Sequence, residues 1–102
     1  MNKIQVVLHD DWGGFDLPEA VRNELNINDD MFWNDYHHGD INSRSDIKLI
    51  ESFNRNEAVC KALGLSIYEI EFDGDISNLY IHDYDGVESV KYVVGPTRTK
   101  IK

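Results

Sequence analysis

A β-hairpin towards the C-terminal end is the sequence feature that most restricts how this chain can fold. Two runs rich in β-branched and aromatic residues are separated there by the pair Asp85-Gly86. An Asp-Gly pair in this position is typical of a two-residue turn, which fixes the residues that face each other and pairs Tyr84 with Val87. Asp83 then lies opposite Glu88, although like charges across a strand pair repel. We interpret this conflict beside the turn as a mark of function.

Hydrophobic periodicity elsewhere predicts two more strands and two helices. The expected strands are 3–8 and 65–72, and the expected helices are 17–26 and 47–63. With 102 residues, 41% of them hydrophobic, the chain has the length and composition of one globular domain. We expect an α+β fold in which a mostly antiparallel sheet of about four strands packs against one or two helices, in the order β-α-α-β-β-β. Residues 1–95 form this domain, and 96–102 are a basic tail that frays or folds back on the acidic surface.

Residues with helix-capping chemistry mark the ends of both helices. Asp16 and Glu19 have the spacing of a capping box, in which each side chain accepts a hydrogen bond from a backbone N–H at the start of the first helix. Asp46 has the position and chemistry of an N-cap for the second helix. Residues 54–56 interrupt the apolar pattern of that helix, so a break is expected there, and Gly64 ends it.

The segment 26–45 is rich in Asn, Asp, Gly and Ser, as loops are, yet it contains large aromatic residues. Phe32, Trp33 and Tyr36 are side chains that a fully solvated loop rarely contains. We therefore expect a long loop with a short helical turn, which its aromatic residues anchor on the domain.

The charge of the chain restricts the partners that it can bind. The 19 acidic residues and 10 basic residues give a net charge of −9. Such a charge repels phosphate backbones and anionic membrane surfaces, so neither a nucleic acid nor a membrane is expected as a partner. It suits a protein with a basic surface, while the simpler interpretation is that the acidic residues keep the chain soluble.

The sequence has no feature of a secreted or membrane protein. Cys60 is the single cysteine and cannot form an intrachain disulfide, and no signal-peptide pattern opens the sequence. No apolar run approaches the ~18 residues that span a bilayer. We therefore expect a protein of a reducing compartment, the cytoplasm.

No residue pattern indicates catalysis or a bound metal. The histidines include the adjacent pair His37-His38, but no histidine or cysteine has the spacing of a zinc site. The Asp-Gly segments at 73–75 and 85–86 lack the ligand spacing of a calcium loop, and tight turns explain them. Cys60 falls on an apolar face of a predicted helix, as an inert buried thiol does. We expect a protein that is not an enzyme and that binds neither a cofactor nor a metal.

Four short motifs occur along the chain in the order that one known family shows. They are Trp12-Gly13-Gly14-Phe15-x-Leu17-Pro18, Asp46-Ile47-Lys48-Leu49-Ile50-Glu51, Leu65-x-Ile67-x-Glu69-Ile70 and Tyr84-Asp85-Gly86-Val87-Glu88. With these motifs the chain resembles a family of small proteins encoded by tailed bacteriophages and prophages, over about residues 3–90. It departs from the family pattern at Trp12, Pro18 and Ile47 and in the segments 54–61 and 95–102. The resemblance implies a viral protein that works in the cytoplasm of a bacterial host.

Together with the acidic charge, the resemblance implies a non-enzymatic phage accessory protein that binds and inhibits a host immune effector, as an anti-CRISPR protein does. Carboxylates would face a basic groove of the host protein, and aromatic residues would anchor the contact. The predicted partner-binding residues are Asp10, Asp11, Trp12, Asp29, Asp30, Phe32, Trp33, Asp35, Asp83, Asp85 and Glu88. For the aromatic residues, core packing under the long loop is the alternative interpretation.

Two other functions remain open. A sponge that sequesters a nucleotide immune signal between subunits would need cations for the phosphates, for which the candidates are Arg22, Arg44, Lys48 and Arg55. A structural or housekeeping phage protein would have no role in defence. A sponge would be a tight homo-oligomer, and an inhibitor would form a salt-sensitive complex with one host protein. A structural protein would show neither property.

Overall fold

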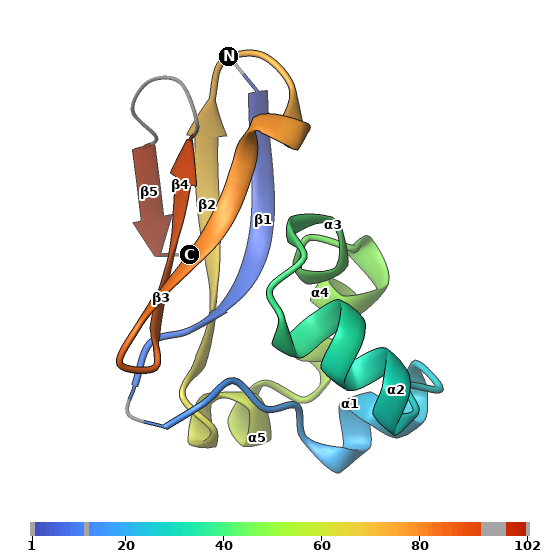
Figure 1. Ribbon diagram of the computed structural model, residues 1–102. Coiled ribbons are helices and arrows are strands. Elements are labelled where there is room, and N and C mark those ends of the chain that lie inside the picture. The colour runs from blue at the N-terminus through green and yellow to red at the C-terminus, as the bar shows by residue number, and fades with distance from the viewer. Residues whose placement is uncertain (1, 12, 93–97, 102) are drawn as a thin grey trace.

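A central pair of antiparallel strands separates the two halves of the core. The computed structural model describes residues 2–11, 13–92 and 98–101 (Figure 1). Its elements are β1 (Asn2–His9), α1 (Glu19–Glu24), α2 (Asp29–Met31), the π-helix η1 (Phe32–His37), α3 (Ile41–Arg44), α4 (Ile47–Arg55), α5 (Glu57–Ala62), β2 (Leu65–Phe72), the 3-10 helix η2 (Ile76–Asn78), β3 (Leu79–Tyr84), β4 (Val87–Tyr92) and β5 (Arg98–Ile101). β1 and β2 pair along their whole length, from Asn2 opposite Phe72 to His9 opposite Leu65.

The strands form two antiparallel sheets. The first has the order β1-β2-β5, and the second is the hairpin of β3 and β4. The α+β class is confirmed, but the strands are divided between two sheets, whereas the sequence predicts a single sheet of about four strands. β5 pairs with β2 from Arg98 opposite Glu71 to Ile101 opposite Tyr68. Part of the basic tail is therefore a strand of the first sheet.

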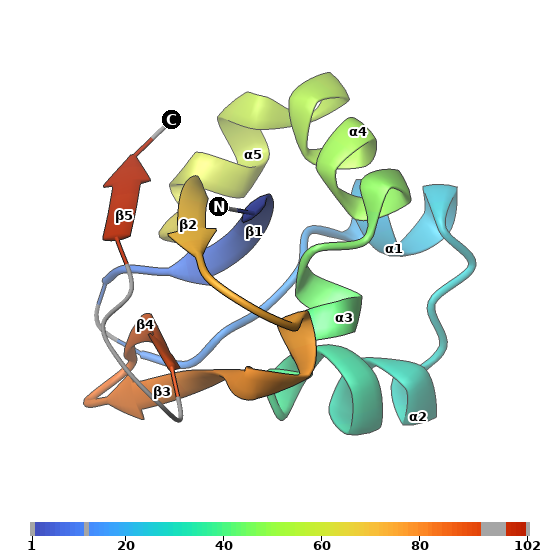
Figure 2. The same cartoon turned by 90° about the horizontal axis from the view of Figure 1, so that it is seen from above.

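Each face of β1 and β2 is covered by a different layer, because side chains alternate between the faces of a strand (Figure 2). One face packs against the helices and the other against the hairpin. The helix-side core consists of Val7, Phe15, Leu17, Val21, Ile27, Phe32, Leu49, Ile50, Phe53, Cys60, Leu65 and Ile67. The hairpin-side core consists of Val6, Leu8, Ile41, Ile70, Phe72, Leu79 and Val90.

The predicted ends of the long helical segment are confirmed. The Asp46 side chain caps α4 by accepting the Lys48 N–H at 2.8 Å, and α4 and α5 meet at Asn56. Gly64 follows α5 with a φ of +78°, and the imidazole of His9 lies where a side chain at this position would be. Glycine is therefore needed here both for its backbone angle and for its lack of a Cβ atom.

The first helix is shorter than the sequence indicates. α1 covers Glu19–Glu24, because Asn26 adopts a left-handed φ of +53° that stops the helix. The predicted capping box is wrong. Pro18 is the N-cap and no side chain caps the helix, because the Asp16 carboxylate accepts a hydrogen bond from the Arg22 guanidinium instead.

The aromatic segment is more helical than the sequence predicts. Three short elements, α2, η1 and α3, occupy most of 26–45, and the side chains of Asn28 and Asp40 cap α2 and α3. Phe32 is 2% exposed and lies in the helix-side core, so it holds the segment on the domain. For Phe32 the core-packing interpretation is therefore confirmed, and this residue offers no surface to a partner.

Candidate functional site

The β3–β4 hairpin has the register that its Asp-Gly turn predicts. Tyr84 pairs with Val87, and Asp83 pairs with Glu88. The two opposed carboxylates have different surroundings. Asp83 is exposed and accepts the Gly86 N–H of the turn at 2.9 Å, whereas Glu88 is buried. The expected conflict between like charges is therefore resolved by a partner that Glu88 finds in the interior.

That partner is Arg44, with which Glu88 forms a buried bidentate ion pair. The Nη1–Oε1 and Nη2–Oε2 distances are 2.7 and 2.8 Å, and the two side chains are 0% and 4% exposed. Burial of two charges is costly unless their remaining hydrogen-bonding groups are satisfied. The His9 N–H donates to Glu88 Oε1 at 2.7 Å, and Arg44 donates to the carbonyls of Val7 and Tyr36. The pair therefore joins α3, β1 and β4.

Glu88 is consequently a residue of the interior and not of a binding surface. Its carboxylate already accepts hydrogen bonds from one guanidinium and one backbone N–H, and the flat face of that guanidinium lies 3.3 Å from the ring centre of Phe15. The structure thus removes Glu88 from the predicted partner-binding residues, because a buried and neutralised carboxylate offers no charge to a partner.

The turn of the hairpin packs on the loop that follows β1. Asp10 forms a β-bridge with Val87. A Cβ atom at Gly86 would lie 2.0 Å from the carbonyl oxygen of Gly13, so only glycine permits this approach. Two acidic segments from opposite ends of the chain therefore lie together at one end of the molecule.

We name this end of the molecule the hairpin-tip surface. It consists of Asp10, Asp11, Asp83, Tyr84, Asp85 and Val87. Its four carboxylates are exposed, and its two apolar side chains, Tyr84 and Val87, are 73% and 48% exposed. An adjoining hollow of about 490 Å³ is lined by His82, Tyr84, Asp85, Val87, Ser89 and Lys91. Exposed apolar groups surrounded by charged ones are typical of protein-binding surfaces.

A tyrosine of β2 supports one carboxylate of this surface. The Tyr68 hydroxyl donates to Asp10 Oδ2 at 2.7 Å. Burial, together with the hydrogen bond to Asp10 and its negative charge, raises the pKa of Tyr68 to about 12, because these effects disfavour the phenolate. The hydroxyl is therefore protonated at neutral pH and orients Asp10.

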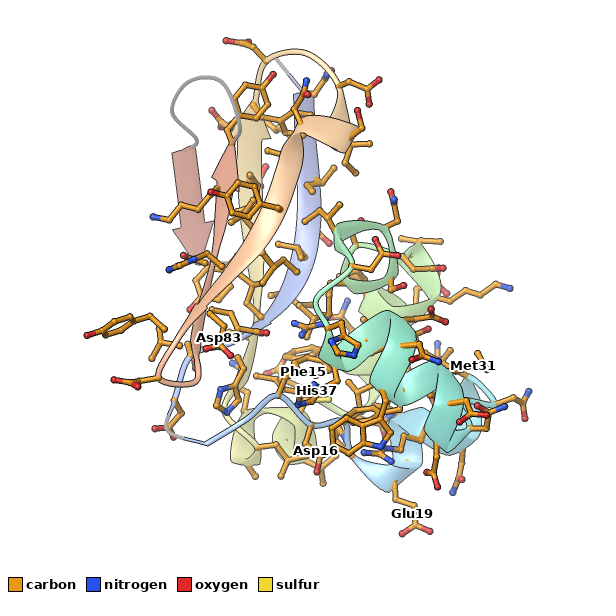
Figure 3. The ribbon with its side chains drawn as sticks, viewed as in Figure 1. Phe15, Asp16, Glu19, Met31, His37 and Asp83 are labelled. Atoms are coloured by element: carbon orange, nitrogen blue, oxygen red, sulfur yellow. The ribbon has the colours of Figure 1, made fainter. Side chains whose placement is uncertain are left out.

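The other predicted acidic residues lie elsewhere, on what we name the α2–η1 surface. It consists of Asp29, Asp30, Trp33 and Asp35, all of them exposed. Figure 3 places Met31 of α2 and Asp83 of the hairpin on opposite sides of the molecule. Trp33 is 53% exposed. The predicted residues thus form two separate surfaces, and Trp12 lies outside the described residues.

The candidate phosphate ligands and metal ligands are not gathered into a site. Three of the four cations are engaged by carboxylates, in the pairs Arg44–Glu88, Arg22–Asp16 and Arg55–Glu24. Across the described residues, no three His, Cys, Asp or Glu side chains lie close enough to hold a metal ion. Burial raises the pKa of the Cys60 thiol to about 11, so little of the nucleophilic thiolate exists at neutral pH.

The sequence interpretation omits two features of the site. It treats Arg44 only as a candidate phosphate ligand, although the conflict between Asp83 and Glu88 indicates that one of these carboxylates needs a cation. It also omits Tyr84 and Val87 from the partner-binding residues. The predicted register, which places these two side chains on one face at the end of a two-stranded ribbon, is the signal that identifies them.

Comparisons of the chain with protein-family models, curated proteins and solved structures find no match. In the part of the chain that the structure describes, no helix is long and apolar enough to cross a membrane.

Proposed function

We propose that this protein is a non-enzymatic phage accessory protein that binds a basic host protein through the hairpin-tip surface and inhibits a bacterial immune effector in the host cytoplasm. The observation that carries the proposal is the position of Tyr84, which is 73% exposed among four exposed carboxylates. Exposed tyrosines are frequent anchors of protein interfaces, because a large ring is buried at a small cost in conformational entropy.

The charge of the hairpin-tip surface indicates the class of partner. Four carboxylates on one surface of a chain with net charge −9 attract a basic groove and speed association with it. The hollow beside Tyr84 is of a size to accept the aliphatic part of an arginine or lysine side chain, whose cation would stack on the ring. A nucleotide sponge is less well supported, because three of its four candidate cations are engaged by carboxylates.

Two matched triple variants test which surface binds. One combines Tyr84→Ala, Asp83→Asn and Asp85→Asn, and its match combines Trp33→Ala, Asp30→Asn and Asp35→Asn. Each removes one aromatic ring and two negative charges from one of the two surfaces. Asparagine tolerates the left-handed φ of +52° at residue 85, and at residue 83 it keeps the side-chain oxygen that accepts the Gly86 N–H. A loss of binding in one variant alone is therefore not an effect of net charge or of turn geometry.

The tagged protein is expressed in bacteria whose CRISPR or other defence systems block a targeted phage. We expect plaque formation to be restored and the effector to co-purify in a complex that weakens as salt rises. The hairpin-tip variant should lose both properties, and the α2–η1 variant should keep them. Loss in the α2–η1 variant alone would move the site to that surface. A parent chain that restores no plaques and binds no defence protein would contradict the proposal.

A further inference from the structure

The outer edge of β1 is closed over one half of the strand. Alternate residues of an antiparallel strand direct their N–H and C=O groups to opposite edges. On the edge away from β2, Arg44 donates to the Val7 carbonyl, and Glu88 accepts the His9 N–H. The buried ion pair therefore takes the place of a neighbouring strand over the C-terminal half of β1.

The N-terminal half of the same edge is open. Lys3 and Gln5 have the same orientation in β1 as Val7 and His9, so their backbone N–H and C=O groups also point away from β2. No described residue forms a hydrogen bond with these groups. This half of β1 rises above α3 and α4 in Figure 1, and a hollow of about 580 Å³ lies beside it. Unpaired backbone groups on an edge strand are a template for another strand.

One twofold register satisfies these groups. In a twofold pair of antiparallel β1 strands, the axis can pass beside Lys3, Ile4 or Gln5, and the residue at this centre faces its own copy. A centre at Lys3 opposes two lysines, which repel. A centre at Gln5 opposes Lys3 to Val7, whose carbonyl already accepts from Arg44. A centre at Ile4 pairs each Lys3 with Gln5 of the second copy, and all of their outward N–H and C=O groups find partners.

From this self-complementarity we infer that two copies of the chain pair through β1 and form one continuous sheet with the strand order β5-β2-β1-β1-β2-β5. The two Ile4 side chains meet at the twofold axis, on the face that carries the hairpin-side core. Lys3 does not block the edge, because its amine lies 3.7 Å from Glu69 and 3.8 Å from Glu71 of β2. The hairpin-tip surface stays free, since it lies beyond the other end of β1.

The dependence on salt separates this self-association from the binding of a basic partner. Each copy has a net charge of −9, so two copies repel and the dimer tightens as salt screens the charges. A complex with a basic protein weakens under the same conditions. The two proposals use different surfaces, so either can fail while the other holds.

Sedimentation equilibrium of the full chain, from micromolar to millimolar concentration and at two ionic strengths, tests the dimer. We expect the mass to rise from 11.8 kDa towards twice that value. Gln5→Pro removes an N–H that its own copy does not use, and proline is tolerated on edge strands, so the fold should persist while the dimer weakens roughly tenfold or more. Gln5→Thr keeps the N–H and should dimerise as the parent does.

A charge exchange tests the register itself. Gln5→Lys places lysines opposite each other in both pairs and should weaken the dimer roughly threefold to tenfold. Addition of Lys3→Gln should restore it, because each lysine again faces a glutamine. A chain that sediments at 11.8 kDa under all conditions overturns the inference. A dimer that Gln5→Lys does not weaken overturns it as well. If Gln5→Pro does not fold, the two charge-exchange variants still test whether the chain dimerises through β1.

Discussion

The two faces of the β3–β4 hairpin present opposite surfaces on adjacent residues. On the inner face, Leu79 and Glu88 are buried, whereas on the outer face Tyr80 and Tyr84 are 48% and 73% exposed. Because side chains alternate along a strand, one ribbon provides both surfaces. Residues one position apart on this ribbon therefore differ in burial and in what they can contact. The inner face holds the hairpin on the sheet, and the outer face is available to a partner.

Removal of the buried carboxylate of the hairpin should have the largest effect on stability. Glu88→Ala leaves Arg44 buried without a counter-charge and the His9 N–H without an acceptor. We expect the free energy of unfolding to fall by about 3 to 5 kcal/mol, measured by urea unfolding. Asp83→Asn, directly across the hairpin, should change it by less than about 0.5 kcal/mol, because this side chain is exposed. Asp83 lies on the same face of the hairpin as Glu88, so equal losses would contradict the contrast between the exposed and the buried carboxylate of this pair.

Two consecutive residues of β3 allow the same test with apolar side chains. Leu79→Ala removes a buried side chain from the hairpin-side core and should lower the free energy of unfolding by about 2 to 4 kcal/mol. Tyr80→Ala, the next residue on the opposite face, should lower it by about 0.5 kcal/mol. Thermal and urea unfolding of both variants provide the measurement. A larger loss for Tyr80→Ala would show that the outer face is covered.

Alkaline pH should weaken the contact between β2 and the loop at the hairpin tip. The pKa of Tyr68 rises from 10.0 to about 12 on folding. A group whose pKa is raised in the folded state contributes stability that is complete below pH 10 and is lost as the pH rises through 12. The parent should therefore lose stability over this interval more steeply than Tyr68→Phe, in urea unfolding at a series of pH values. Parallel curves would assign the titration to another group.

The features of the fold that the sequence predicts are the local ones. The Asp85-Gly86 turn sets the hairpin register, the Asp46 side chain caps α4, and Gly64 ends α5, each through contacts within a few residues. The division of the strands into two sheets depends on packing between distant segments, and so does the pairing of Arg44 with Glu88. The conflict between Asp83 and Glu88 indicates that a cation is needed, but no local pattern identifies that cation as Arg44, and none predicts the two sheets.

For the candidate site, too, the sequence predicts the individual residues but not their arrangement. The sequence identifies acidic residues at 10–11 and 83–85 as binding residues, and the structure brings them together through the Asp10–Val87 bridge. It equally identifies Asp29, Asp30 and Asp35, which lie on the α2–η1 surface instead. Charge and exposure follow from composition and periodicity, whereas the grouping of charges into one surface follows from topology.

The smallest expected effect on stability, and the largest on binding, belongs to Tyr84. Because its ring is 73% exposed, Tyr84→Ala leaves no cavity and should change the free energy of unfolding by less than about 0.5 kcal/mol. The same substitution removes the proposed anchor and should weaken the complex with the co-purified partner roughly tenfold or more, measured by titration calorimetry. Tyr84→Phe, which keeps the ring, should retain most of the affinity. A Tyr84→Ala variant that unfolds readily but binds as the parent does would reverse the roles of the two faces.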